Sequence, residues 1–272
     1  GTGYKQYERR KMTFATGVKS KIWEYQYAAE DPNFPEIPKI TPGESQPDSE
    51  RVSSFVYPGG ILAVHAEGRG KDEIWNALKN KNVYGTSGPR ILLWFDLINS
   101  PEGQVPMGSV ITMSQNPRFI IKAAGSFKQN PGCSNESIDS LSSERLEYLC
   151  AGECNNPSNE REVIEKIEII KITPQIYAGE AVSPLIQDPW KSIPCQGSGE
   201  CIVEFEDQNF SRDSVYYVRA IQNPTPAING STLSKRGNFD LCKGSFRTNL
   251  KDDCLSMTNE RAWSSPIYVN KP

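Results

Sequence analysis

The chain has 272 residues, with 30 lysines and arginines against 33 aspartates and glutamates, which gives a formal net charge of −3. This balance offers no electrostatic reason to expect binding to nucleic acid or to an anionic membrane surface. No apolar run approaches the roughly 18 residues that a spanning helix needs, so no membrane span is expected. The chain opens at Gly1 without a visible signal peptide, and we expect a processed or truncated product that can still bury a core.

The first 50 residues contain little that indicates a buried element. A short helix is predicted near Tyr4–Arg10, in a segment rich in tyrosine, lysine and arginine. Five prolines lie between Asp31 and Glu50. Because proline fixes φ and lacks an amide proton, residues 31–50 are expected to form a long extended loop. Loops of this length are often functional or mobile, and a plain surface excursion is the alternative.

The next segment has the pattern of an α/β protein. The continuous apolar run Gly60–Ala66 fits a buried strand of a parallel sheet. A helix is predicted from Asp72, where negative charge is favoured at a helix start, to the Tyr84-Gly85 turn. After Gly88-Pro89 the pattern changes to successive strands. We therefore place a boundary between Tyr84 and Arg90, with residues 1–87 as one piece and 88–272 as the other.

The second piece is predicted to be an antiparallel β-sandwich, which makes the whole chain α+β. Several segments alternate apolar and polar residues, as expected of strands with one buried and one exposed face. Residues 133–160 form a cysteine-containing insertion with a possible short helix at Ser143–Leu149, and Asn223–Pro226 is expected to be a rigid turn. The predicted strands are Arg90–Leu97, Ser109–Met113, Arg118–Ala123, Ile164–Ile172, Ile202–Glu206, Val215–Gln222 and Ser265–Val269.

The seven cysteines all lie at or after Cys133. Cysteine metal sites usually contain C-x-x-C pairs, whereas three residues separate Cys150 from Cys154, so disulfides are favoured over zinc. Disulfides imply an oxidising compartment, and we expect a periplasmic or secreted protein. The expected disulfides join Cys195 to Cys201, Cys242 to Cys254 and Cys133 to Cys150. The last pairing is open, because spacing alone lets any of Cys133, Cys150 and Cys154 be the thiol left over; we predict Cys154.

His65, the only histidine, is the first candidate functional residue. Residues two apart on a strand share a face, so His65 and Glu67 are expected to lie together at a strand end, where α/β barrels commonly place their sites. They could act as base, substrate contact or auxiliary ligand, and a hydrogen-bonded structural histidine is the alternative. Arg69 could hold an anionic group bidentately, or form a surface salt bridge.

Thr86–Arg90 is the second candidate segment, because it combines hydroxyls, a glycine and an arginine that could contact phosphate. It lacks the spacing of a P-loop, and a structural turn is the alternative. Ser87 and Arg90 are therefore candidate substrate contacts. Ser87 is not expected to be a nucleophile, because the G-x-S-x-G elbow is absent.

Five strings together resemble one bacterial family of unknown function, and they span nearly the whole chain. They are GGILAVHAEGR, IWNALKNKNVYGTSGPRILLWFDL, PMGS at 106–109, VYYVRAIQNPTPAINGSTL from Val215 and ERAWSSPIYV from Glu260. Members of this family look like relatives of the PHP (polymerase and histidinol phosphatase) metal-dependent phosphoesterases. The resemblance implies an upstream α/β-barrel domain whose His, Asp and Glu residues bind divalent zinc, manganese or iron.

The resemblance also implies that this chain is the C-terminal portion of such a protein, since Gly1–Lys5 resembles a segment that closely follows the family's last metal motif. A single histidine cannot build that centre, so no metal or other cofactor is expected in this chain alone. Residues 1–87 would be the tail of the PHP-like domain. One strand and one helix cannot cover each other, so the missing N-terminal half or another copy is expected to complete the sheet beside Gly60–Ala66.

Two functions remain open from the sequence. The first is the C-terminal portion of an exported PHP-like metal-dependent hydrolase, inactive without its other half. The second is a secreted β-sandwich that serves binding, sugar recognition or assembly without catalysis. A sandwich fold by itself favours neither of them.

Overall fold

The computed structural model describes residues 59–150, 154–228 and 255–272. Residues 60–223 and 259–272 form one compact unit, and most of the second unit, 1–59 with 224–258, lies outside the described residues. The helix predicted near Tyr4–Arg10 and the loop predicted at 31–50 also lie outside them. The described part is mostly β-sheet with few helices, in agreement with the expected class.

The larger sheet has eight strands, and all its described pairs are antiparallel except that of β14 with β5. Its main path runs through β1 (Ile61–Val64), β2 (Val83–Thr86), β13 (Leu255–Ser264), β12 (Ser214–Ile228), β14 (Ile267–Asn270) and β5 (Val110–Thr112). A branch adds β9 (Ile164–Ile172), which pairs with β12, and then β10 (Ile186–Pro194). A short 3₁₀ helix, η2 (Ser183–Leu185), precedes β10.

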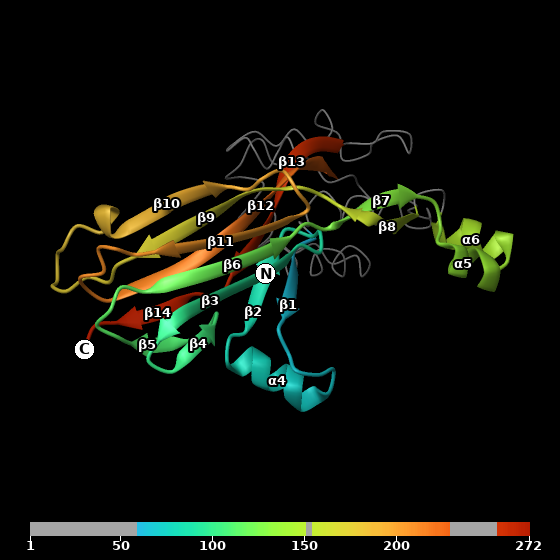
Figure 1. Cartoon of the computed structure of the whole chain (residues 1–272). Helices are drawn as coiled ribbons and strands as arrows, with labels where there is room; N and C mark the ends of the chain where they lie inside the picture. Colours follow the sequence, from blue (N-terminus) through green and yellow to red (C-terminus); the bar gives the residue numbers. More distant parts are fainter. Residues whose placement is uncertain (1–58, 151–153, 229–254) are drawn as a thin grey trace, which may run out of the picture. The chain divides into compact units, whose positions relative to one another are not determined.

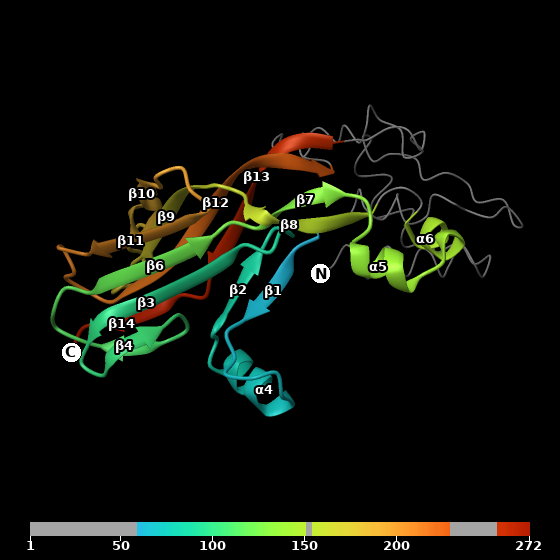
Figure 2. The same ribbon diagram turned by 45° about the vertical axis from the view of Figure 1, so that its right-hand side comes forward.

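The smaller sheet has four strands in the order β11 (Glu200–Glu206), β6 (Arg118–Ala124), β3 (Leu92–Ser100) and β4 (Gly103–Pro106). A separate ribbon of β7 (Phe127–Pro131) and β8 (Asn155–Arg161) carries the short helices α5 (Asn135–Ser140) and α6 (Ser143–Cys150) at its tip (Figures 1 and 2). Helix α4 (Lys71–Lys79) lies at the end of the β1–β2 hairpin (Figure 2).

The two sheets share one hydrophobic core. Alternate residues of β3, β6, β9 and β12 are buried, because successive side chains of a strand point to opposite faces. The ring of Phe119 on β6 lies 4.8 Å from that of Phe205 and 4.8 Å from that of Tyr216 on β12. The contact between Phe119 and Phe205 lies within the smaller sheet, and that between Phe119 and Tyr216 joins the smaller sheet to the larger one, as in a sandwich.

The predicted strands all coincide with strands of the structure, and Ile164–Ile172 has the predicted bounds. The helix predicted at Ser143–Leu149 corresponds to α6, and the one predicted from Asp72 corresponds to α4. However, α4 ends at Lys79, and the Tyr84-Gly85 turn expected to end it lies within β2. The strands that were not predicted are β2, β4, β7, β8, β10 and β13. Most of these are short, polar or interrupted by proline, so their residues do not show the apolar alternation that indicates a strand.

The environment of Gly60–Ala66 differs from the prediction. β1 pairs antiparallel with β2 at the end of the larger sheet, with Ile61 41 % and Leu62 60 % exposed, so it is not a buried parallel strand. β2 in turn pairs with β13, and the boundary expected between Tyr84 and Arg90 falls inside the compact unit of residues 60–223 and 259–272. Within the described residues, the segment 60–87 is therefore an extension of the sandwich sheet.

The turn predicted at Asn223–Pro226 is wrong, because these residues continue β12. The pairing of β12 with β9 ends at Gln222 opposite Ile164. Pro224 and Pro226 are two apart, so their missing amide protons fall on the same edge of the strand. The N–H of Asn223 donates to the carbonyl of Val163, next to β9, so that edge is the one that faces away from β9. The ladder with β9 therefore loses no hydrogen bond to these prolines.

The disulfide between Cys195 and Cys201 is present, as predicted. It does not close a hairpin within one sheet, because β10 before it belongs to the larger sheet and β11 to the smaller one. It therefore links the two sheets. Cys154 is also disulfide-bonded, which corrects the expectation that it is the thiol left over. The Cys242–Cys254 pair and the side chain of Cys150 lie outside the described residues.

Candidate functional site

His65 follows the last residue of β1 and is fixed by two hydrogen bonds. Its backbone N–H donates to the carbonyl of Asn82 at 2.8 Å, which extends the β1–β2 hairpin by one pair. Its ring atom Nε2 lies 2.8 Å from the carbonyl oxygen of Leu93. A carbonyl only accepts, so Nε2 is the donor of this hydrogen bond and carries a proton. The imidazole centroid lies 5.3 Å from that of Tyr84 and 5.7 Å from that of Trp94.

A pocket of about 320 Å³ opens beside this imidazole. It lies between the end of β1, the turn before β2, and strands β3 and β4. Buried Phe95 and Met107 contribute to its apolar lining, while Trp94 is 39 % exposed. The residues that carry its chemistry are His65, Glu67, Asn82, Trp94 and Asp96.

The pocket has an acidic character. Its described lining contains the carboxylates of Glu67 and Asp96 and no lysine or arginine. One oxygen of Asp96 already accepts a hydrogen bond from the Gln104 amide at 2.8 Å. Two carboxylates without a basic partner favour neutral or cationic ligand groups over a free phosphate.

Glu67 joins His65 in this pocket as the sequence predicts, but the other three candidates do not. Arg69 and Arg90 are exposed and do not line the pocket. Ser87 lies five positions along the chain from Asn82, about 16 Å for an extended strand. The five predicted site residues therefore do not form one site.

Ser87 is engaged in a local network with β13. Its hydroxyl donates to Oε2 of Glu260, and it accepts a hydrogen bond from the backbone N–H of Arg261 at 2.8 Å. The Thr86 hydroxyl accepts from the Gly88 N–H at 3.2 Å, as in a structural turn. Burial raises the pKa of Glu260, although the Ser87 hydrogen bond and the charge of Arg261 oppose this effect. This network accounts for the polar groups of the turn without a ligand.

Trp94, Asp96 and Asn82 are pocket residues that the sequence analysis did not identify as functional. Trp94 was predicted only as part of a strand. A signal was present for two of them, because Trp94 and Asp96 are two apart on one strand and must share a face. For Asn82 there was none, since its position depends on a hairpin that the sequence pattern did not predict.

No group of three or more His, Cys, Asp or Glu residues that could hold a metal ion occurs in the described ranges, 59–150, 154–228 and 255–272. In the same part of the chain, we find no helix with the length and apolar character that crossing a membrane would require.

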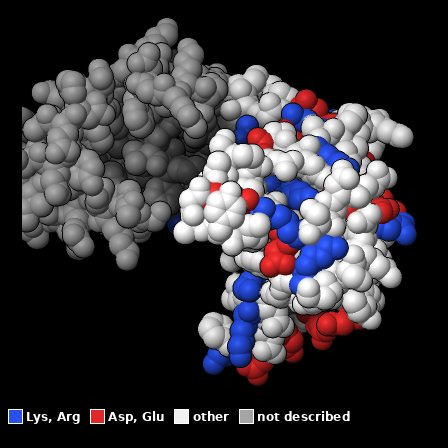
Figure 3. All heavy atoms as spheres, turned by 90° about the vertical axis from the view of Figure 1, so that its left-hand side faces the viewer, with Lys and Arg blue, Asp and Glu red and all other residues white. Residues whose placement is uncertain are grey.

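On the face shown in Figure 3, acidic and basic side chains lie close to one another and do not form a large patch of one sign. Such a mixed surface is typical of a solvated protein face and gives no reason to propose a polyanionic partner for it.

Comparison with known proteins gives one match. The chain matches the family model described as "Protein of unknown function (DUF3604)" over residues 16–131 and 192–271, more than two thirds of its length. No curated protein and no solved structure matches the chain. The matched ranges include β1, α4, β2, β3 and β4, which enclose the His65 pocket. The chain is therefore a member of the DUF3604 family.

Proposed function

We propose that the pocket beside His65 binds the alcohol portion of a substrate for an exported PHP-like hydrolase, a phosphoesterase-like enzyme that depends on divalent metals. The observation that supports this is the convergence of one imidazole, two carboxylates and an exposed indole on a single pocket. Pockets that combine an apolar surface with a few convergent polar groups are the usual binding sites of small molecules.

The described residues do not fit the catalytic metal centre of such an enzyme. The Nε2 of His65 is committed to the Leu93 carbonyl, and no three potential ligands converge within the described ranges. A hydrolytic metal site needs at least three protein ligands in most enzymes. In this proposal the metals are held outside the described residues, and His65 and Glu67 position the substrate.

The chemistry of the pocket suits a polyhydroxylated group. The Trp94 ring offers a flat apolar surface against which the C–H face of a sugar ring could pack. Glu67 and Asp96 accept hydrogen bonds from hydroxyl groups, and the Asn82 amide can donate or accept. Because the pocket lacks a cation, the phosphate of a sugar phosphate would lie outside it, with the sugar inside.

Two further parts of the proposal rest on separate observations. The Cys195–Cys201 disulfide is consistent with export to the periplasm or beyond, because disulfides persist in oxidising compartments.

β1 pairs only with β2 among the described strands. Its other edge could therefore receive a strand from an N-terminal half or from another copy of the chain.

A binding experiment on the full chain tests the pocket. Neutral monosaccharides, their phosphates and inorganic phosphate are titrated into protein labelled with ¹⁵N, and the Trp94 indole signal is assigned with Trp94→Phe. We expect a sugar to shift this signal, and Glu67→Gln and Asp96→Asn to weaken its binding at least about tenfold. Arg90→Ala is the matched control and should bind normally. Shifts caused by inorganic phosphate alone would contradict the proposal.

A second candidate function is a secreted binding module without catalysis. The same acidic, tryptophan-containing pocket supports it, since recognition of a sugar needs no metal. Hydrolysis assays with phosphate esters of the bound sugar, with added Zn²⁺, Mn²⁺ or Fe²⁺, distinguish the two. Binding without turnover by the full chain and any co-purifying partner would favour the module.

A further inference from the structure

Lys171 and Asp207 form a buried charged pair between the two sheets. Lys171 lies on β9 of the larger sheet, and Asp207 directly follows β11 of the smaller one. The Lys171 ammonium contacts Oδ2 of Asp207. Asp207 is 0 % and Lys171 8 % exposed, so neither group has ready access to bulk water.

Aromatic rings enclose the pair. The Nζ atom of Lys171 lies 5.2 Å from the ring centroid of Trp190 and 5.8 Å from that of Tyr216. The Trp190 and Tyr216 rings also pack near each other, with centroids 6.2 Å apart, and the Phe119 and Phe205 rings extend this cluster into the core. A shell of this kind keeps water away from the amine and the carboxyl group.

The Asp207 carboxyl group is held by several hydrogen bonds. Its Oδ1 accepts from the N–H of Asn209 at 3.1 Å, and its Oδ2 accepts from the Tyr216 hydroxyl at 2.5 Å. Its own N–H donates to the carbonyl of Pro117 at 3.1 Å. Tyr216 lies directly opposite Lys171 in the β12–β9 register. The amine, the carboxyl group and the phenol are therefore fixed relative to one another by the backbone.

We propose that Lys171 and Asp207 react with each other to form an amide crosslink between the two sheets. The ammonium first passes a proton to the carboxylate, which leaves a neutral amine beside a carboxylic acid. The Nζ lone pair attacks Cγ, and the C–N bond forms as the C–O bond breaks. The departing oxygen takes the protons it needs and leaves as water, so an ammonium and a carboxylate become one amide and one water molecule.

Three features of the site favour this reaction without a further reactant. The fixed contact replaces a bimolecular encounter, and intramolecular reactions of this kind have large effective concentrations. Exclusion of water removes the hydration shell that would otherwise separate the amine from the carboxyl group. The Tyr216 phenol can donate to the oxygen that leaves; burial and the neighbouring Asp207 carboxylate raise its pKa, so it keeps its proton.

Ion pairs elsewhere on the chain lack these features. Lys166 and Glu168, on the same strand β9, are 2.9 Å apart with side chains 36 % and 14 % exposed. Lys128 and Glu160 are 3.0 Å apart with side chains 48 % and 75 % exposed. Water reaches these groups and competes with any contact between them, so we expect no crosslink at either pair. They provide matched controls within one molecule.

The intact mass of the reduced full chain tests the proposal directly. We expect a mass about 18 Da below that of the sequence, which is the loss of one water. Fragmentation of a proteolytic digest should yield a branched peptide in which Lys171 is joined to Asp207. A full sequence mass, in protein that is folded by circular dichroism, would overturn the proposal.

Variants locate the crosslink. Lys171→Met and Asp207→Ala should each restore the full mass, whereas Lys166→Met should retain the loss of about 18 Da relative to its own sequence. Tyr216→Phe should keep the fold but slow the appearance of the lighter species at least tenfold after refolding. A mass loss that survives Lys171→Met would place the modification elsewhere and contradict this assignment.

Discussion

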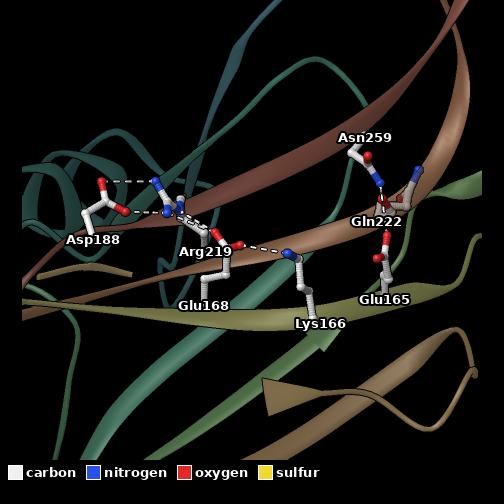
Figure 4. A network of polar contacts seen from close by, with 7 residues as sticks. All are labelled: Glu165, Lys166, Glu168, Asp188, Arg219, Gln222 and Asn259. Atoms are coloured by element: carbon white, nitrogen blue, oxygen red, sulfur yellow. Dashed lines mark hydrogen bonds and ion pairs between the residues drawn. The ribbon is translucent and has the colours of Figure 1, made fainter. Parts of the chain in front are cut away.

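The two faces of β9 hold their charged residues in opposite ways. On the inner face, Lys171 contacts Asp207 among aromatic rings, with Asp207 0 % exposed. On the outer face, Glu168 binds Lys166 and Arg219, and Arg219 also reaches Asp188, as Figure 4 shows. In each case the residue directly opposite on β12 joins the cluster, Tyr216 inside and Arg219 outside.

This contrast indicates that the exposure of a charged cluster to water, and not its number of ion pairs, determines how much the cluster contributes to the stability of the fold. The outer network has more ion pairs than the inner one, yet its side chains are 14–40 % exposed, so water still competes for its groups. Ion pairs that water can reach contribute about 0–1 kcal/mol. Inside, each charge depends on its partner because no water can replace it. Loss of the inner pair should therefore reduce stability more than loss of the outer network. The four predictions that follow are ranked from the largest expected effect on stability to the smallest.

The largest effect is expected from Asp207→Ala. It leaves the Lys171 ammonium and the Tyr216 hydroxyl buried without their acceptor, so the free energy of unfolding should fall by about 3–5 kcal/mol, and further where the crosslink is lost. Denaturant unfolding monitored by tryptophan fluorescence measures this loss. The double variant Lys171→Met with Asp207→Leu leaves no unpaired charge, so it should be more stable than Asp207→Ala. Equal loss in both variants would argue against an unpaired charge as the cause.

The second largest effect is expected from Cys195→Ser with Cys201→Ser, which removes the described disulfide between the sheets. The loop it closes is short, so the unfolded chain gains limited freedom and the loss should be about 2 kcal/mol. Thermal unfolding of the variant and the wild type without reductant measures it, and the difference between them should disappear when a reductant opens the disulfides of both proteins. A loss larger than that of Asp207→Ala would reverse the proposed order of interior contacts.

The sequence analysis predicted the outer face of β9 better than the inner one. The alternation in Lys166-Ile167-Glu168-Ile169 predicts a strand with one polar face. The bounds agree with the structure, and Lys166 and Glu168 lie half-buried on the face opposite to the buried Ile167 and Ile169. Lys171 breaks this pattern by placing a charge on the buried face. Its partner is 36 positions away, after a strand of another sheet, and no local pattern predicts that contact.

The pocket illustrates the same limit. His65 and Glu67 are two apart, so a local rule predicted that they lie together. Asp96 and Asn82 join them only because β2 pairs back on β1 and because β3 lines the same pocket. Neither arrangement follows from a period in the sequence.

The third prediction concerns Glu260, a buried acid without a basic residue in direct contact among the described ion pairs. Its pKa is raised above the ordinary 4.5 by burial, so the folded state binds its proton more tightly than the unfolded state does. This acid therefore favours folding below the unfolded pKa and opposes it as the pH rises through the folded value. The free energy of unfolding should therefore decrease less between pH 4 and pH 7 in Glu260→Gln than in the wild type. Urea unfolding at several pH values measures this decrease. A larger decrease in the variant than in the wild type would contradict a raised pKa of Glu260.

The smallest effect is expected from Arg219→Gln on the outer face. Burial acts to raise the pKa of Glu168, but Lys166 and Arg219 together hold it below the ordinary 4.5, so its stabilisation exists above that value and is lost as the pH falls through the folded pKa. At neutral pH, Arg219→Gln should therefore lower the free energy of unfolding by about 0.5–1 kcal/mol. The difference should shrink at 1 M salt, where the screening length is about 3 Å, and also below pH 4 as Glu168 becomes protonated. Asp207→Ala should keep most of its effect at high salt, because solvent ions do not reach a buried pair. If 1 M salt reduces the loss of stability in Arg219→Gln and in Asp207→Ala by the same fraction, the inner pair is no better shielded from solvent ions than the outer network.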